Sequence, residues 1–400
     1  MQENQILYPI IILQKGKDDA VKRFHPWIFS GAIKELPKNL STGSPVHISD
    51  NQGNILGTGF YEKDTIAVKL VSFNACQLDT DFWKNKISEA FNLRIKLGLV
   101  ENTHTTAYRL IHSEGDNLAG LIIDIYNKTA VIQTQTTGMA MQIEPIREAI
   151  VTVMKDVIES VYWKSAKALA SINKDLTSDG YIYGNQSDTI ISENGMKFHI
   201  DIEKGQKTGF FIDQRESRNL LKSLSTGKRV LNTFSYSGGF SVAALLGKAT
   251  SVVSVDSSQS AIDLCNKNIN LNGFDDKQHT SITADAKRYL EELKENEFDL
   301  IVLDPPAFAK NHHHRHKGLL GYKFLNYEAL RKIAPGGFLF TFSCSQAVDQ
   351  QAFQSIVMAA AIEAKRNVRI LYRLSQPADH PTNIFHPEGT YLKGLVVEVL

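Results

Sequence analysis

The hydrophobic and polar positions divide the chain into three stretches. From Tyr8 to Phe73, short alternating apolar runs are separated by turns rich in Gly, Asp, Asn and Ser, which predicts a small all-β barrel. From Thr80 to Gly184, apolar residues recur at helical spacing over Phe82–Gly98 and over about 141–159, with two or three predicted strands between them. We therefore expect a multidomain chain whose first domain covers residues 8–75 and whose central α+β domain covers residues 76–186.

The remaining stretch, residues 187–400, alternates strand and helix patterns after a predicted hairpin with its turn at Glu193–Gly195. Repeated βα units predict a doubly wound α/β domain with a parallel sheet, whose ligands bind beyond the carboxyl ends of the strands. Four chemically capable residues each follow a predicted strand: Asp256, Asp285, Asp304 and Cys344. One edge of one sheet should therefore present all four.

The segment from Lys228 to Asp256 reads as strand, turn, helix and strand. Gly238 and Gly239 allow a sharp turn and a close approach of the backbone to a ligand. Asp256 closes the next strand, about 20 residues after the turn, where a carboxylate can accept hydrogen bonds from a ribose. The pattern predicts a nucleoside cofactor, and the absence of the GxGxxG spacing argues against a dinucleotide.

Asp304 ends a buried strand and is followed by Pro305 and Pro306, which hold the exit of the chain rigidly. Such an aspartate can accept from the polar edge of a base, or donate to it when protonated, although an acidic turn with a structural role has the same pattern. Cys344 follows another buried strand. Its thiolate could add to C6 of a pyrimidine and make C5 nucleophilic, whereas a cysteine at such a place is otherwise an inert core residue.

Other polar segments have two interpretations each. The segment Gly205–Arg215 could cover the cofactor or plug a domain junction, and basic residues beside Trp27 could bind RNA or form a solvated rim. The tract of residues 312–317 contains four histidines but no Cys or carboxylate at ligand spacing, so we predict a loop that contacts phosphate or is disordered, and no metal. Arg109, His112, Glu114 and Asp116 read as exposed turn residues.

Composition narrows the setting. A hydrophobic content of 42% with 22% charged residues is typical of a soluble globular protein. Three scattered cysteines predict a reducing cytoplasm, and no segment reads as a signal peptide or a membrane span. The net charge of +1 argues mildly against a nucleic-acid partner, so RNA binding would need a local basic patch.

With these residues in view, the chain resembles the bacterial PUA-domain class I methyltransferases of large-subunit rRNA, of the cytosine-C5 type. The resemblance rests on HPWIFSGAI, RLIHSEGDNLAGLIIDIY, KTGFFIDQR, NTFSYSGGF, VLDPPAF and TFSCS, and it covers nearly the whole chain. It implies an N-terminal PUA-like β-barrel, a central α+β domain and a C-terminal Rossmann-like methyltransferase domain that binds S-adenosyl-L-methionine. The chain departs from the family pattern at the histidine tract, which affects the expected recognition of the target.

The resemblance, together with the reasoning above, gives a set of expected site residues. Cys344 would be the covalent nucleophile, and Asp304 would lie beside the target base. The residues expected at the cofactor are Phe234, Ser235, Tyr236, Ser237, Gly238, Gly239, Asp256, Asp285 and Ala286, with Phe211 and Gln214 from the preceding segment. The residues expected to contact RNA are Lys15, Lys22, Arg23, Trp27, Pro305, Pro306, Phe308 and Lys310.

The sequence therefore predicts a cytoplasmic S-adenosylmethionine-dependent enzyme that forms 5-methylcytosine in 23S rRNA. Rival hypotheses are a guanine N-methyltransferase without covalent catalysis, a nicotinamide-dependent oxidoreductase and an inactive RNA-binding ribosome assembly factor. The expected partner is large-subunit rRNA, and we expect no association with a membrane. Exposed β edges could pair two copies of the chain into a homodimer.

Overall fold

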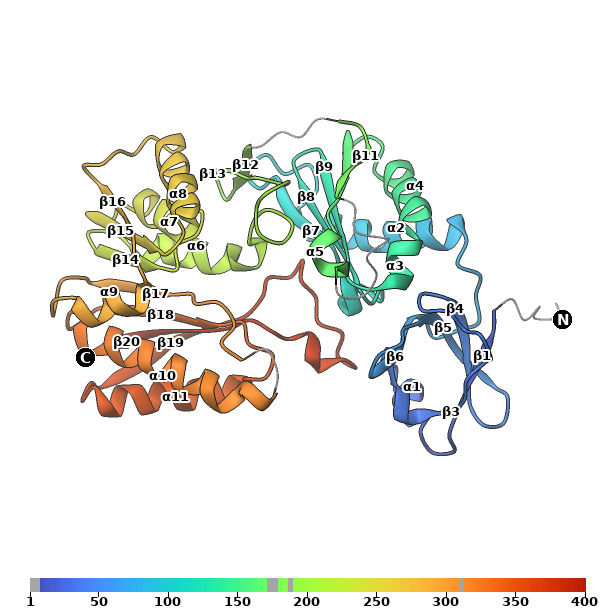
Figure 1. Cartoon of the computed structure of the whole chain (residues 1–400). Helices are drawn as coiled ribbons and strands as arrows, with labels where there is room; N and C mark the ends of the chain where they lie inside the picture. Colours follow the sequence, from blue (N-terminus) through green and yellow to red (C-terminus); the bar gives the residue numbers. More distant parts are fainter. Residues whose placement is uncertain (1–7, 171–178, 186–189, 310–311) are drawn as a thin grey trace. The chain divides into compact units, whose positions relative to one another are not determined.

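The computed structural model describes residues 8–170, 179–185, 190–309 and 312–400. The chain divides into two compact units (Figure 1). The first contains the described residues up to Ile191 together with Ile200–Phe210 and Ala378–Gly389, and the second contains Ser192–His199, Phe211–Pro377 and Thr390–Leu400. Among the described residues, no helix has both the length and the apolar character needed to cross a bilayer.

The first unit begins with a six-stranded sheet in the order β2-β6-β5-β4-β1-β3. Inward side chains such as Ile11, Val46 and Leu70 are buried, because alternate residues of each strand face one core. A short helix, α1, precedes β2. The elements are β1 (Ile10–Leu13), α1 (Asp19–Lys22), β2 (Trp27–Phe29), β3 (Ile33–Glu35), β4 (Pro45–Ser49), β5 (Ile55–Tyr61) and β6 (Ile66–Ser72).

The same unit continues with a five-stranded sheet in the order β11-β10-β9-β8-β7, against which helices α2 and α4 pack. The predicted second helix is too long: α4 ends at Val153, and the buried strand β10 follows, because Tyr162 and Trp163 favour an extended chain. The elements are α2 (Thr80–Lys96), β7 (Ala107–His112), β8 (Leu121–Tyr126), β9 (Thr129–Thr134), α3 (Thr137–Met141), α4 (Ile143–Val153), β10 (Ser160–Trp163), α5 (Ala166–Leu169) and β11 (Gly180–Tyr183).

Charged side chains are buried around the five-stranded sheet. The sequence had predicted that Arg109, His112, Glu114 and Asp116 would be exposed turn residues, and none of the four is exposed. Arg94, whose side chain is fully buried, forms two hydrogen bonds of 2.6 and 2.9 Å with Asp116 and donates to the Asp379 carbonyl. Arg109 pairs in the same way with buried Asp124. The bond from Arg94 to the Asp379 carbonyl, and one of 3.0 Å from the Arg109 backbone amide to the Asp379 carboxylate, hold the distant segment Ala378–Gly389 within the first unit.

The second unit is built on a seven-stranded sheet in the order β16-β15-β14-β17-β18-β20-β19. The first five strands are parallel, as predicted, while β20 pairs antiparallel with both β18 and β19. Helices α6, α7 and α8 cover one face and α9, α10 and α11 cover the other (Figure 1). A hairpin of β12 (Ile190–Glu193) and β13 (Met196–His199) precedes this sheet.

The order of strands and helices in this unit follows the predicted alternation, with two differences. Helix α10 begins at Arg315, whereas the sequence pattern predicted a helix only around Asn326–Lys332. The histidine tract is therefore not a loop but a 3-10 turn, His312–His314, that leads into this helix. Helix α11 was not predicted. The elements are α6 (Arg215–Leu224), β14 (Arg229–Thr233), α7 (Gly239–Leu246), β15 (Ser251–Asp256), α8 (Gln259–Leu271), β16 (His279–Thr283), α9 (Ala286–Glu292), β17 (Leu300–Leu303), α10 (Arg315–Lys332), β18 (Phe338–Ser343), α11 (Gln350–Glu363), β19 (Val368–Leu374) and β20 (Lys393–Val399).

Candidate active site

The turn between β14 and α7 has an unusual backbone that forms a cradle at the sheet edge. Phe234, Tyr236 and Gly238 all have positive φ angles, of 55°, 44° and 76°. A Cβ atom on Gly238 would lie 2.5 Å from the Sγ atom of buried Cys265. Only glycine therefore fits position 238, both for its left-handed backbone and for the space it leaves.

Asp256 holds this turn in place from the end of β15. Its carboxylate accepts hydrogen bonds of 2.9 Å from the backbone N–H groups of Tyr236 and Ser258. A carboxylate has about four lone-pair sites, so capacity remains for ribose hydroxyls. Asp285 is exposed and caps α9 by accepting from the N–H of Arg288 at 2.9 Å, and the neighbouring Ala286 is buried.

Two segments that the sequence assigned to the cofactor meet at the cradle. The Phe211 ring lies edge-on to the Tyr236 ring, with 5.3 Å between their centroids. Ser235 Oγ and Gln214 Oε1 are buried and have no hydrogen-bond partner among the described residues. Buried polar atoms of this kind normally have partners, so the site suits a ligand with polar groups, such as S-adenosylmethionine.

Asp304 follows β17 and is partly buried. Burial raises its pKa from 3.8 to about 7, and repulsion from Asp213 adds to the rise, whereas a hydrogen bond from Gln214 and the charge of Arg218 oppose it. Near neutral pH this carboxyl group is thus protonated in a large fraction of molecules. It can donate a hydrogen bond as well as accept one.

Cys344 and the Asp304–Pro305 segment come together at the ends of the neighbouring strands β18 and β17. The Sγ atom of Cys344 lies 3.9 Å from the Pro305 carbonyl oxygen, and the residue is partly exposed. Cys265 differs, because burial raises the pKa of its thiol to about 11 and its sulfur lies among Ser254 and His279. The geometry therefore separates an accessible thiol at the site from an inert one in the core.

Sequence reasoning did not identify Lys393, which lies at the start of β20. Its side chain is buried, and its Nζ atom donates hydrogen bonds to the carbonyl oxygens of Ser345 at 2.6 Å and Tyr391 at 2.7 Å. Burial lowers its pKa from 10.5 to about 8, while the nearby Cys344 and Asp349 act to raise it. The signal was present in the sequence, since a lysine just before the apolar run Leu395–Val397 needs an explanation.

Arg218, also missed, fixes the segment that carries Phe211. Its guanidinium binds both carboxylate oxygens of buried Glu193 at 2.6 Å and donates to the Phe211 carbonyl at 2.9 Å. On the other side of the site, the Tyr391 hydroxyl donates to Asp213 at 2.7 Å. These contacts position Phe211 and Asp213.

The residues expected to contact RNA fall into two groups. In the first unit Lys15, Lys22 and Arg23 are exposed, Lys22 forms an ion pair with Asp18, and the Trp27 indole donates to Glu114 at 2.8 Å.

The second group lies beside Asp304 in the second unit. Pro305 is buried and Pro306 is exposed. The Phe308 ring packs 4.8 Å from the Tyr322 ring, and Lys310 lies outside the described residues.

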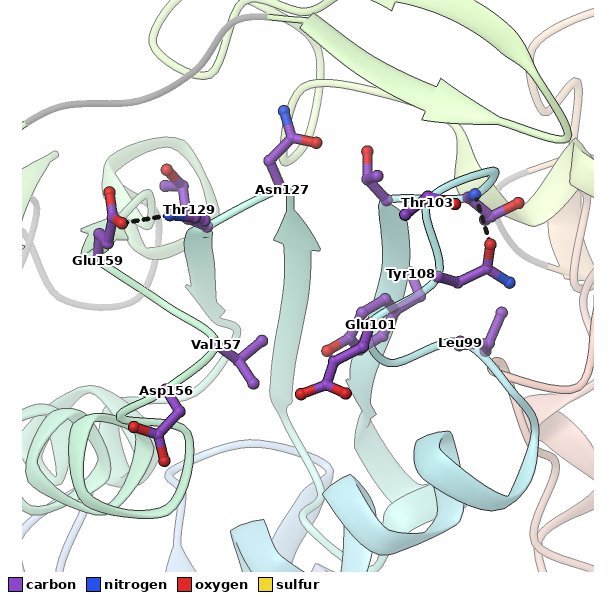
Figure 2. A pocket seen from close by; sticks show the side chains of 13 residues that line it. Leu99, Glu101, Thr103, Tyr108, Asn127, Thr129, Asp156, Val157 and Glu159 are labelled. Carbon is purple, nitrogen blue, oxygen red and sulfur yellow. Dashed lines mark hydrogen bonds and ion pairs between the residues drawn. The ribbon is translucent and has the colours of Figure 1, made fainter.

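A hollow of about 670 Å³ lies elsewhere, at the ends of β7, β8 and β9 in the first unit (Figure 2). Glu101, Asp156 and Glu159 line it, and its Lys128 is paired with Glu159. Acidic walls repel phosphate, so this hollow does not suit a nucleic-acid backbone. It shares no residue with the predicted site.

Comparison with known proteins identifies the family of the chain. Residues 174–392 match the family described as S-adenosylmethionine-dependent methyltransferase, and residues 11–73 match the PUA-like domain. Proteins called ribosomal RNA large subunit methyltransferase I are similar over nearly the whole chain. The protein of that name from Alteromonas mediterranea is 38% identical, covering 97% of this chain and 98% of its own length, and that from Aeromonas salmonicida is 39% identical, with the same coverage.

Solved structures show the same fold. A protein from Streptococcus mutans described as a SAM-dependent methyltransferase has a TM-score of 0.84 at 22% identity, covering 98% of this chain and 100% of its own. A methyltransferase structure complexed with SAH also has a TM-score of 0.84, at 23% identity with the same coverage. The chain therefore belongs to the S-adenosylmethionine-dependent methyltransferases with an N-terminal PUA-like domain, in the family of the ribosomal RNA large subunit methyltransferase I proteins.

Proposed function

We propose that this protein transfers a methyl group from S-adenosylmethionine to C5 of a cytosine in large-subunit (23S) rRNA. The relatives' shared name supports the substrate class, and the PUA-like domain is consistent with an RNA partner. One observation carries the choice of base: the partly exposed thiol of Cys344 lies 3.9 Å from the Pro305 carbonyl, directly after Asp304. Methylation of a guanine nitrogen needs no nucleophilic thiol, whereas C5 of cytosine becomes reactive only after addition at C6.

In this proposal Cys344 loses its thiol proton to solvent, and the resulting thiolate forms a bond to C6 of a cytosine that has left its stack. Asp304, with a pKa of about 7, carries a proton that it shares with N3 as negative charge builds on the ring. The bound cofactor supplies an electrophilic methyl group at its sulfonium. The electron pair placed at C5 would take up that methyl group, with S-adenosylhomocysteine as the leaving group. A base removes the C5 proton, the C6–sulfur bond breaks to release the Cys344 thiolate, and the N3 proton returns to Asp304.

The charge of Lys393 acts on the thiol of Cys344. As an ammonium group it attracts negative charge on the Cys344 sulfur, and its two carbonyl partners keep it in place. Its pKa of about 8 leaves most molecules with the cation at pH 7. We infer that Lys393 is a positioning residue that favours the reactive thiolate.

The test is a single-turnover reaction with large-subunit rRNA that lacks its modifications and with methyl-labelled cofactor. The wild type should yield 5-methylcytosine, and Cys344→Ala should lose at least about a thousandfold in rate, because no other group can form the adduct. Cys265→Ala is the matched control and should remain active, since that thiol is buried away from solvent. A methylguanine product that survives Cys344→Ala would refute the mechanism, and no labelled product at all would favour an assembly factor without catalysis.

A further inference from the structure

Two histidines and a glutamate from distant parts of the sequence meet in the first unit. His25 lies between α1 and β2, His386 precedes a 3-10 turn at Pro387–Gly389, and Glu388 lies within that turn. The Nε2 atoms of His25 and His386 lie 3.7 and 3.8 Å from one oxygen of the Glu388 carboxylate. One ligand atom from each residue lies within 4.8 Å of the other two.

His386 is a buried residue whose two ring nitrogens could bind a ligand. Only 2% of its surface is exposed, and neither ring nitrogen has a hydrogen-bond partner among the described residues. A buried polar group without a partner destabilises a protein by about 1–3 kcal/mol. A neutral imidazole nitrogen with a free lone pair is the form of histidine that coordinates metal ions.

The geometry of the three groups fits a small tetrahedral cation. Bonds of about 2.0–2.2 Å at tetrahedral angles place ligand atoms about 3.4 Å apart. The two separations to the Glu388 oxygen exceed that value by a few tenths of an ångström, and all three ligand atoms lie within 4.8 Å of one another, so side-chain rotations that bring the two imidazoles together complete the site. Two imidazoles with one carboxylate suit Zn²⁺ better than Ca²⁺ or Mg²⁺, which prefer oxygen ligands.

Neighbouring groups set the tautomer of His25 and enclose His386. The backbone N–H of Trp27 donates to the Nδ1 atom of His25 at 3.2 Å, and the Trp27 carbonyl oxygen lies 3.4 Å from the same atom. A metal at Nε2 would move the proton to Nδ1, so the bond from the Trp27 amide would be exchanged for one to the Trp27 carbonyl, a usual outer partner of a ligating histidine. The Trp27 ring lies 4.4 Å from the His386 ring and covers one side of the cluster. The positive charge of Lys69 disfavours a cation beside His386, while the negative charge of Glu114 favours one.

We propose that His25, His386 and Glu388 form a zinc site, with water as the fourth ligand. The site revises the sequence prediction that the protein binds no metal, and it is separate from the histidine tract that prompted that question. It does not depend on the methylation chemistry proposed above. A bound ion would join the turn after α1 to the Ala378–Gly389 segment and so stabilise the first unit.

The test is a titration of the full-length, metal-free protein with Co²⁺, followed by competition with Zn²⁺. Bound Co²⁺ should quench the fluorescence of Trp27, which contacts the site, and give the visible absorption of a four-coordinate ion. The quenching should be lost in Trp27→Phe if it arises at this site. His386→Phe should abolish the quenching and weaken binding at least about tenfold, because it removes a direct ligand.

Two further variants keep the result interpretable. Alanine at all four histidines of the tract, residues 312, 313, 314 and 316, is the matched control and should leave the quenching and its midpoint unchanged. Glu388→Gln changes an exposed side chain, so it should fold and yet lose most of the zinc-dependent rise in melting temperature. Quenching that persists in His386→Phe or Glu388→Gln, or that disappears with the tract, would overturn the proposal.

Discussion

Replacing Asp304 with Asn should change how stability depends on pH. The raised pKa of this carboxyl group means that the folded protein binds its proton more tightly than the unfolded chain does. Between pH 3.8 and about 7 the folded state therefore holds more protons, and the free energy of unfolding falls as the pH rises. Above pH 7 the destabilisation is constant. Asparagine has the same shape and does not titrate, so the variant lacks this pH dependence.

The size of the effect follows from the two pKa values. Moving a pKa from 3.8 to about 7 corresponds to about 4 kcal/mol at high pH. About 1.5 kcal/mol of this is already present at pH 5, because the unfolded carboxyl group is ionised there. The stability of Asp304→Asn relative to wild type should thus increase by at most about 2.5 kcal/mol between pH 5 and pH 8, and by less where solvent screens the carboxylate.

The measurement is urea unfolding at pH 5 and pH 8, followed by far-UV circular dichroism. Tryptophan fluorescence would not serve, because Trp27, Trp83 and Trp163 all belong to the first unit and Asp304 to the second. Asp299→Asn is a matched control just before the same strand. The Arg229 partner lowers the pKa of Asp299, so that carboxyl is ionised at both pH values. An equal stability difference between Asp304→Asn and wild type at pH 5 and pH 8 would show that Asp304 has an ordinary pKa.

Substitutions of Lys393, Gly238 and Arg94 test three other parts of the structure. Lys393→Met should slow methyl transfer on the order of tenfold, and Lys393→Arg should restore part of the rate. The readout is the single-turnover rate from pH 6 to 9, in which loss of the cation near pH 8 should be visible only with lysine. Equal rates in the wild type and both variants would remove Lys393 from the mechanism. Gly238→Ala should destabilise the second unit by about 2–4 kcal/mol and weaken cofactor binding, while Gly273→Ala, with a similar φ of 83° but open space around it, should lose only about 1 kcal/mol in thermal unfolding. Arg94→Met should destabilise the first unit by about 3–5 kcal/mol in tryptophan-monitored unfolding because it leaves Asp116 unpaired, and a loss below 1 kcal/mol would show that solvent reaches that carboxylate.

The sequence was informative where local patterns carry the structure. The alternation of apolar runs indicated the β barrel, the α+β layer and the βα units, because burial of one face imposes a period of two or of 3.6 residues. The sharp turn between β14 and α7 could also be predicted from its glycines, since a left-handed backbone restricts which residues can stand there. The length of α10 was missed because a run of histidines gives no apolar period.

Other features depend on partners that no local pattern reveals. The position of Lys393 beside Cys344 follows from the antiparallel pairing of β20 with β18, which the repeated βα pattern did not predict. The meeting of His25 with His386 likewise requires that the Ala378–Gly389 segment belong to the first unit. The sequence by itself determined the order of the elements and the residues at the strand ends, because those depend on neighbours along the chain. Only the tertiary structure decided which charges and thiols share one environment, because pKa values and ligand sets are set by burial and by residues hundreds of positions away.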